Sequence, residues 1–164
     1  MDAPRITTTI ITLNEEKSLP KALESVSWTD EIVVVDSGST DQTTEIAKKF
    51  GAKVFFNRWP GSGAQKNFAQ SKASNDWVLN IDADEVVPKN LAKEIRRQLA
   101  QNGREYLGYE IPRKTFYLGR WIRHGGWYPN YLIRLAHRKH SKWTEPQVHE
   151  SLSLIHISEP TRPC

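Results

Sequence analysis

Residues 77–85 read Trp-Val-Leu-Asn-Ile-Asp-Ala-Asp-Glu, an apolar stretch that runs into three acids. The apolar part is typical of a buried strand, so Asp82, Asp84 and Glu85 are expected at its carboxyl end. Carboxylates this close repel one another unless a positive charge lies between them. Because hard oxygen ligands suit Mg²⁺ or Mn²⁺, the stretch predicts a divalent cation beside these acids.

A second strand ends in the same way. Residues 33–41 read Val-Val-Val-Asp-Ser-Gly-Ser-Thr-Asp, so Asp36 and Asp41 follow a stretch with no polar alternation. Such a strand is expected to be covered on both faces. Two strands that end in acids within one chain predict a nucleotide and its metal along one edge of a sheet.

Strand and helix patterns alternate along the first hundred residues. The sequence predicts strands at 6–12, 31–35, 53–56 and 77–81. It predicts a helix that begins with a Ser39–Gln42 capping box and runs to Phe50, and helices at 64–73 and 88–101. Two more strands are expected at 106–112 and 131–135. The repeated β-α-β order indicates an α/β fold with a mostly parallel sheet and helices on both faces.

Composition narrows the class of protein. The 164 residues fit one domain, and 38% hydrophobic and 26% charged residues are ordinary for a globular protein. The sequence contains no run of 18 apolar residues, so no membrane-spanning helix is expected. The N-terminal residues lack a signal-peptide pattern, which favours a cytoplasmic protein. The single cysteine, Cys164, excludes a disulfide within the chain.

Positive charge is concentrated in one segment. The net charge is +4, and residues 104–142 alone carry nine Lys or Arg against two Asp or Glu. A basic segment of this kind favours a polyanionic partner, such as a phosphate, an anionic lipid surface or a nucleic acid.

The motifs resemble those of a known family. Residues 12–16, 33–41 and 82–85 are similar to family-two glycosyltransferases of the GT-A (Rossmann-like) fold. Residues 113–116, 119–122, 124–129 and 148–150 are similar to bacterial lipopolysaccharide core-biosynthesis glucosyltransferases. The resemblance implies transfer of a sugar, with glucose favoured, from a UDP-sugar to a hydroxyl of the lipopolysaccharide inner core, assisted by Mg²⁺ or Mn²⁺.

The resemblance also implies a donor site. Asp84 is the favoured metal ligand, and Asp82 is expected at the ribose or a metal-bound water; Asp36 is expected at the uracil ring. Lys66 has two open interpretations, a contact with the diphosphate or a solvated helix charge. The expected nucleotide-sugar residues are Thr12, Asn14, Glu15, Asp36, Ser37, Gly38, Asp41, Lys66, Asp82, Ala83 and Asp84.

The acceptor side is expected in the later motifs. A carboxylate should take the proton of the acceptor hydroxyl, and Glu150 is favoured over Glu110 and Glu145. Basic and aromatic side chains are expected to hold the phosphorylated core, namely Arg113, Arg120, Arg123 and Trp127. The same segment could instead be ordinary packing of a long loop. Peripheral contact with the anionic inner face of the inner membrane fits the charge, and no nucleic acid partner is expected.

The last residues depart from the family pattern. Residues 152–164 resemble a translated sequencing adapter, so we expect an incomplete GT-A domain over 1–151 and a non-native tail over 152–164. Pro160 and Pro163 are expected to keep the tail free of regular structure.

Several alternatives stay open. The chain could be an inactive truncated fragment that binds only UDP, or a non-catalytic basic module that binds membrane or nucleic acid. A nucleotide-dependent dehydrogenase would need Gly-x-Gly-x-x-Gly after the first strand, where Thr-Leu-Asn-Glu stands at 12–15. A sugar-nucleotide nucleotidyltransferase would need a glycine-rich, arginine-containing loop at the same place.

Overall fold

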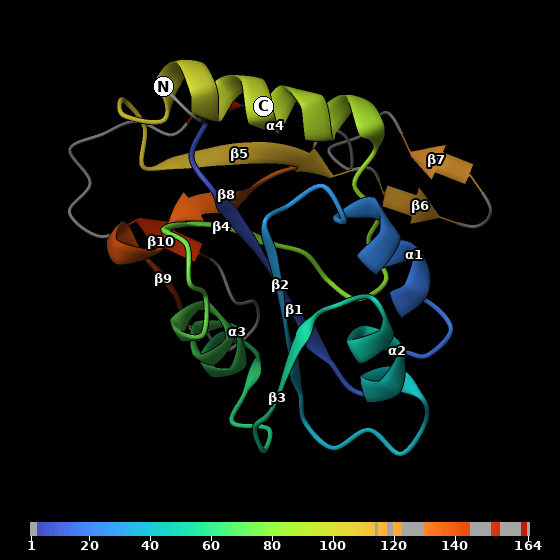
Figure 1. Cartoon of the computed structure of the whole chain (residues 1–164). Helices are drawn as coiled ribbons and strands as arrows, with labels where there is room; N and C mark the ends of the chain where they lie inside the picture. The colour runs from blue at the N-terminus through green and yellow to red at the C-terminus, as the bar shows by residue number, and fades with distance from the viewer. Residues whose placement is uncertain are drawn as a thin grey trace.

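The computed structural model describes residues 3–113, 115–117, 120–122, 130–144, 152–154 and 162–163. Its centre is a seven-stranded sheet in the order β11-β5-β8-β4-β1-β2-β3 (Figure 1). Four parallel strands form one half of the sheet, and their bounds are β1 (Ile6–Thr12), β2 (Glu31–Asp36), β3 (Lys53–Phe56) and β4 (Trp77–Asn80). The four predicted strands of this half are therefore confirmed, to within one residue at their ends.

The helices connect these strands and cover both faces of the sheet. Their bounds are α1 (Leu19–Ser25), α2 (Thr43–Lys49), α3 (Ser62–Ser71) and α4 (Lys89–Asn102). Figure 1 shows α1, α2 and α4 apart from α3, which lies on its own beside β1. The predicted mostly parallel α/β fold with two covered faces is confirmed.

Successive side chains of β2 point to opposite faces of the sheet, and both faces are buried. Val34 belongs to the large core with Ala47 of α2 and Leu99 of α4, whereas Val33 and Val35 pack with Ala69 of α3. Successive side chains of a strand point to opposite faces, so an unbroken valine run can be buried only between two layers. Each fully buried valine contributes about 1.5–3 kcal/mol through removal of apolar surface from water.

The other half of the sheet reverses direction. Strand β8 (Asn130–His137) lies between β4 and β5 (Gly108–Arg113) and is antiparallel to both. As a consequence Asn130 and Arg113 lie at the edge where the parallel strands end, and His137 lies beside Trp77 at the opposite edge. The strands predicted at 106–112 and 131–135 are confirmed, with β8 two residues longer at its C-terminal end.

Short elements complete the described structure. A hairpin joins β6 (Thr115–Tyr117) to β7 (Arg120–Ile122). The 3-10 turn η1 (Arg138–His140) leads from β8 into β9 (Ser141–Trp143).

The expectation that the tail, residues 152–164, is free of regular structure is wrong for two segments. Strand β10 (Leu152–Leu154) pairs with β9, and β11 (Arg162–Pro163) pairs with β5. Strand β11 is an edge strand of the large sheet, and an edge strand tolerates proline because one side of it needs no ladder hydrogen bond.

The predicted capping box of α2 is wrong. Gln42 is the N-cap residue and makes no side-chain cap hydrogen bond. The Ser39 hydroxyl donates instead to Asp36 Oδ1, 2.5 Å away. The predicted end of the helix is confirmed, because Phe50 caps α2 and Gly51 follows with a positive φ of 81°.

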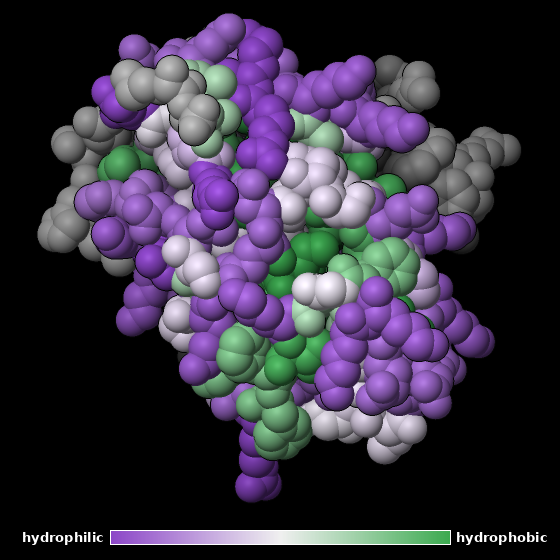
Figure 2. All heavy atoms as spheres, in the orientation of Figure 1, coloured by the Kyte–Doolittle hydropathy of each residue, from purple (hydrophilic) through white to green (hydrophobic). Residues whose placement is uncertain are grey.

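The face shown in Figure 2 is largely hydrophilic. Figure 2 shows hydrophilic side chains over the outer surfaces of the helices, with hydrophobic side chains visible in the gaps between them. In the part of the chain that the structure describes, no helix combines the length and hydropathy needed to cross a bilayer.

Candidate active site at the carboxyl edge of the sheet

Three neighbouring strands end at one edge and bring the predicted donor residues together. Thr12 of β1 lies opposite Asp36 of β2, and Thr9 of β1 lies opposite Asn80 of β4. The Ser37 amide donates to the Thr12 carbonyl oxygen at 3.1 Å, so the β2 strand end stays bound to β1. The acids that follow β2 and β4 therefore share the carboxyl edge, as the sequence predicts.

Asp36 is buried and fully hydrogen bonded. It is 3% exposed, and its carboxylate accepts from Thr12 Oγ1 at 2.8 Å, from Ser39 Oγ at 2.5 Å, and from the amides of Gly38 and Ser39 at 2.9 and 2.7 Å. Burial raises the pKa of the Asp36 carboxyl, but these hydrogen bonds outweigh burial and hold the pKa below its usual value of 3.8. Four donors fill the lone-pair positions of a carboxylate. A uracil imide would have to displace one of them.

The loops after β1 and β2, residues 13–16 and 37–43, bind each other and are called the loop pair below. The Asn14 amide donates to Ser39 Oγ at 2.8 Å, and Asn14 Oδ1 accepts from the Thr40 amide at 2.8 Å. The Glu15 amide donates to Thr43 Oγ1 at 2.8 Å. Asn14 holds a left-handed φ of 53°, a conformation that asparagine tolerates better than most residues. Asn14 and Glu15 thus join the two loops.

Asp41 has a similar role in the loop pair. Its carboxylate accepts from the amides of Thr43 and Glu16, at 2.9 and 3.3 Å, and from the Thr43 hydroxyl. Desolvation acts to raise the pKa of Asp41, but the hydrogen bonds from Thr43 and Glu16 lower it below its usual value. Asp41 therefore positions the start of α2 in this structure.

Residues 81–85 form the acidic turn after β4. Ala83 is buried in the large core, while the Asp84 side chain is exposed and Asp82 is 34% exposed. The turn closes on itself, because the Asp82 amide donates to Glu85 Oε1 at 2.7 Å and the Glu85 amide donates to the Asp82 carbonyl oxygen at 3.0 Å. Among the described residues, no hydrogen bond or ion pair reaches the Asp84 carboxylate.

Two buried cations flank Asp82. Lys66 of α3 is 5% exposed; its Nζ lies 3.8 Å from Asp82 Oδ1 and 4.4 Å from the centroid of the Trp143 ring. Arg134 of β8 is 8% exposed, with a terminal nitrogen 3.6 Å from Asp82 Oδ2. The interpretation of Lys66 as a solvated helix charge is therefore wrong. Sequence reasoning missed Arg134, although an arginine within the apolar stretch 131–136 was a visible signal.

The start of α3 is fixed by side-chain amides. Asn57 Nδ2 donates to Gln65 Oε1 at 2.7 Å, and Gln65 Nε2 donates to the Asn57 carbonyl oxygen at 3.0 Å. Asn67 forms two hydrogen bonds with the backbone of Trp143, at 2.9 and 2.8 Å. These bonds hold α3 against β9, and so they hold Lys66 at the acidic turn.

The acidic turn suits a hard divalent cation that a diphosphate helps to bind. No group of three or more His, Cys, Asp or Glu side chains capable of holding a metal occurs in the described ranges. Mg²⁺ commonly uses one or two carboxylates together with substrate phosphates, and it does not need a complete protein cage. The exposed Asp84 carboxylate, beside the partly neutralised Asp82, fits that pattern.

The expected acceptor residues are only partly described. Arg113 ends β5 at the carboxyl edge, and Arg120 begins β7. Arg123, Trp127 and Glu150 lie outside the described residues. Their roles remain predictions.

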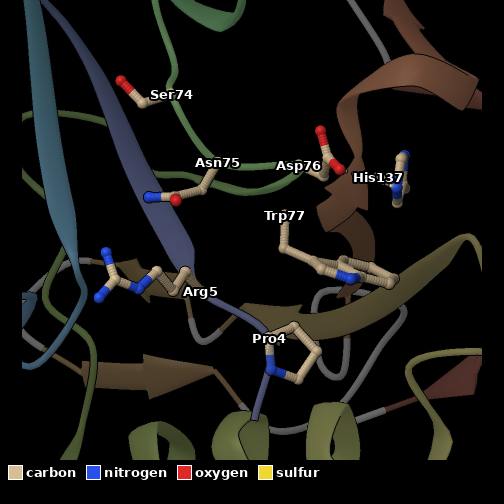
Figure 3. A pocket seen from close by; sticks show the side chains of 7 residues that line it. All are labelled: Pro4, Arg5, Ser74, Asn75, Asp76, Trp77 and His137. Atoms are coloured by element: carbon tan, nitrogen blue, oxygen red, sulfur yellow. Dashed lines mark ion pairs between the residues drawn. The ribbon is translucent and has the colours of Figure 1, made fainter. Parts of the chain in front are cut away.

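A cavity of about 350 Å³ lies at the opposite edge of the sheet, beside the amino ends of β1 and β4. Figure 3 shows Asp76 and His137 next to each other on one side of it and Arg5 across from them. Burial lowers the pKa of the His137 imidazole, and nearby Asp76, 3.8 Å away, opposes that shift. None of the expected site residues lines this cavity, so it is separate from the acidic turn.

Comparison with known proteins identifies similar sequences. Residues 7–156 match the family model of Glycosyl transferase family 2. An uncharacterized glycosyltransferase of Rickettsia typhi is 48% identical over 117 residues, which cover 70% of this chain and 40% of that protein. A lipopolysaccharide core biosynthesis glycosyltransferase, LpsC of Rhizobium meliloti, is 37% identical over 115 residues, covering 67% of this chain and 42% of that protein. The chain thus spans about 40% of the length of the curated relatives it matches.

Solved structures show the same fold. Residues 1–349 of S. aureus TarS superpose with a TM-score of 0.59 at 26% identity, over 73% of this chain and 38% of that fragment. Glucosyl-3-phosphoglycerate synthase of Mycobacterium tuberculosis, solved with Mn²⁺, UDP and glucosyl-3-phosphoglycerate, gives a TM-score of 0.56 at 27% identity, over 66% of this chain and 43% of that chain. Another TarS structure contains UDP-GlcNAc. These likenesses confirm the expected glycosyltransferase fold.

Proposed function

Because this chain belongs to glycosyl transferase family 2, we propose that it carries the donor site of an enzyme that transfers a sugar from a UDP-sugar. The observation that carries the proposal is the single edge at which β1, β2 and β4 end. A buried acid, an exposed acid and two buried cations meet there. Asp36 would hold the loops that face the base, Lys66 would meet the phosphates and Asp84 would meet the metal.

The donor is assigned to UDP on two grounds. The loop pair follows β1 and β2. Amides and hydroxyls that are hydrogen bonded to Asp36 hold it in place, and it would give a polar base a suitable surface to bind. TarS and the synthase, which are similar to this chain, have been solved with UDP. Lys66 can exchange its 3.8 Å contact with Asp82 for a diphosphate oxygen at little cost, since a carboxylate and a phosphate present similar acceptors. Glucose remains the favoured sugar.

Mg²⁺ or Mn²⁺ would be held by Asp84, with Asp82 beside it. Such a cation acts as a Lewis acid that stabilises the charge on the departing UDP. Among the chain's own residues, Lys66 would supply fixed positive charge near the diphosphate, and its burial strengthens the attraction by excluding water.

The acceptor is proposed to be a hydroxyl of the phosphorylated lipopolysaccharide inner core, on the basis of similarity to LpsC. Arg113, Arg120, Arg123 and Trp127 would bind it, and Glu150 would take the proton of the attacking hydroxyl. We further propose a cytoplasmic protein whose basic segment makes peripheral contact with the anionic inner face of the inner membrane. Since the chain spans about 40% of its relatives, a fragment that binds UDP without transferring sugar is the alternative.

Titration calorimetry with UDP tests the donor site. The expected result is UDP binding at least tenfold tighter with Mn²⁺ or Mg²⁺ than in EDTA, and tighter than binding of ADP. Equal UDP affinity with and without metal would contradict the metal role, and equal affinity for ADP would contradict the base assignment. Glucosyl transfer by this chain and by a full-length relative, measured side by side, then separates an enzyme from a binding fragment.

A further inference from the structure

Arg134 is a charged side chain within the apolar stretch 131–136 of β8. It lies on β8 next to Leu135, which belongs to the large core, and is itself only 8% exposed. Removing a guanidinium from water is costly, so a buried arginine needs well-placed acceptors. The contacts of Arg134 show what compensates for that cost.

The guanidinium reaches both ends of the acidic turn. One terminal nitrogen donates to the Asn80 carbonyl oxygen at 3.3 Å, just before the turn begins. The other terminal nitrogen lies 2.9 Å from Glu85 Oε1 and 3.2 Å from Oε2, at the end of the turn. Glu85 Oε1 in turn accepts from the Asp82 amide at 2.7 Å. Arg134, Glu85 and the Asp82 amide therefore form a continuous chain of contacts from β8 across the turn.

Asp84 lies between Asn80 and Glu85, the two residues that Arg134 contacts, and its carboxylate is exposed. Its neighbour Ala83 is buried in the core, which fixes one side of the turn, and Arg134 fixes the two ends. We propose that Arg134 is a positioning residue that sets where Asp84 presents its carboxylate to the metal and diphosphate. This inference rests on the proposed UDP-sugar function.

A positioning role and a purely electrostatic role of Arg134 predict different effects of substitution. If Arg134 only supplied positive charge, lysine would replace it, and glutamine would leave a more negative turn that binds a divalent cation more tightly. If it positions the turn, lysine fails, because an ammonium cannot span Asn80 and Glu85 with a planar fork of donors. Positioning thus predicts that Arg134→Lys and Arg134→Gln change the protein in the same direction.

Amide exchange in the ligand-free chain tests the positioning itself. The amides of Asp82 and Glu85 should exchange at least tenfold faster in Arg134→Lys than in the unaltered chain, with exchange in β1 and β2 unchanged. Glu85→Gln should give a similar increase from the other side of the contact, and combining both changes should add little more. Arg138→Lys is the matched control, since Arg138 contacts Asp76 at the opposite edge of the sheet.

Calorimetry then connects the turn to the ligand. The gain in UDP affinity on adding Mn²⁺ should fall about tenfold in Arg134→Lys and in Glu85→Gln, while UDP affinity in EDTA stays within twofold. Unchanged exchange at Asp82 and Glu85 would overturn the inference, as would an equal loss of UDP affinity in EDTA. If the unaltered chain shows no Mn²⁺-dependent gain, the proposed function fails, and the exchange measurement still decides whether Arg134 positions the turn.

Discussion

The loop pair and the acidic turn lie at the same edge of the sheet but use their acids in opposite ways. Beside the loop pair, four donors satisfy Asp36 at the end of β2, and within the loop pair Asp41 accepts from Thr43 and Glu16. In the acidic turn, Asp84 is exposed, and among the described residues no hydrogen bond or ion pair reaches it. An acid whose acceptor positions are filled stabilises the fold, whereas an open acid is available to a ligand.

A residue that matches a motif is therefore not always a residue that is open to a ligand. Asp36, Asn14 and Asp41 lie in stretches that resemble family motifs, and in the structure they hold the two loops in place. Asp84 also lies in such a stretch, but its carboxylate faces outward. Substitutions in the two regions should therefore separate stability from binding.

Asp84→Ala should have the largest effect on binding. It removes the exposed carboxylate, so the Mn²⁺-dependent gain in UDP affinity should disappear, a loss of roughly 100-fold or about 3 kcal/mol. The free energy of unfolding should change by less than about 0.5 kcal/mol because the side chain is exposed. Calorimetry and thermal unfolding measure the two quantities, with Glu45→Ala on the surface of α2 as the control. A retained metal gain would assign the metal elsewhere.

Asp36→Ala should give the reverse pattern. Four donors lose their acceptor, two of them backbone amides, so the free energy of unfolding should fall by roughly 3 kcal/mol. Denaturant unfolding measures this loss, and Asp84→Ala serves as the control acid from the same edge. An unfolding curve like that of the unaltered chain would mean that the loop pair does not depend on Asp36.

The depressed pKa of Asp36 predicts a pH effect of intermediate size. Its contribution to stability is complete above the usual value of 3.8 and is lost as pH falls through the lower folded value. The melting temperature of the unaltered chain should thus fall more steeply below pH 4 than that of Asp36→Asn. The difference between the two proteins is the measure, because Glu31, whose pKa falls to about 2, titrates in the same range in both. Parallel curves would contradict the assignment.

Asn14 should show the smallest effect. Asn14→Gly removes the acceptor of the Thr40 amide but accepts the φ of 53°, so it should cost about 1 kcal/mol. Asn14→Ala should cost about 1 kcal/mol more, because alanine is strained in the left-handed region. Chemical denaturation of both variants measures the difference. Equal stability of the two would show that the backbone relaxes away from this conformation.

Local patterns predicted much of the fold and the placement of the acids of the candidate site at one edge of the sheet. The apolar stretches of β1, β2 and β4 and the acids behind them are local in sequence, and the β-α-β order places their ends at one edge. The contacts of Arg134 with the two ends of the acidic turn were not predictable in this way. Arg134 meets Glu85 only because β8 inserts between β4 and β5 in antiparallel register, and no local pattern specifies that pairing.

The predicted capping box of α2 was wrong because Ser39 has other hydrogen-bond partners. Ser39 and Gln42 have the spacing of a cap, but Ser39 is drawn to the buried Asp36 and to Asn14 of the neighbouring loop. A hydrogen bond to an acid three residues earlier, together with a contact from the neighbouring loop, thus replaced the cap.

The pairing of Asn67 with Trp143 has a consequence for synthesis of the chain. The two residues are 76 positions apart, so α3 leaves the ribosome long before the strand it is tied to. At about 5–20 residues per second, that interval lasts roughly 4–15 s. In chains arrested before residue 143, the amides of α3 should exchange faster than those of β1 and β2. Helix α3, which carries Lys66, is therefore translated early, but we expect it to become rigid only when β9 has been made.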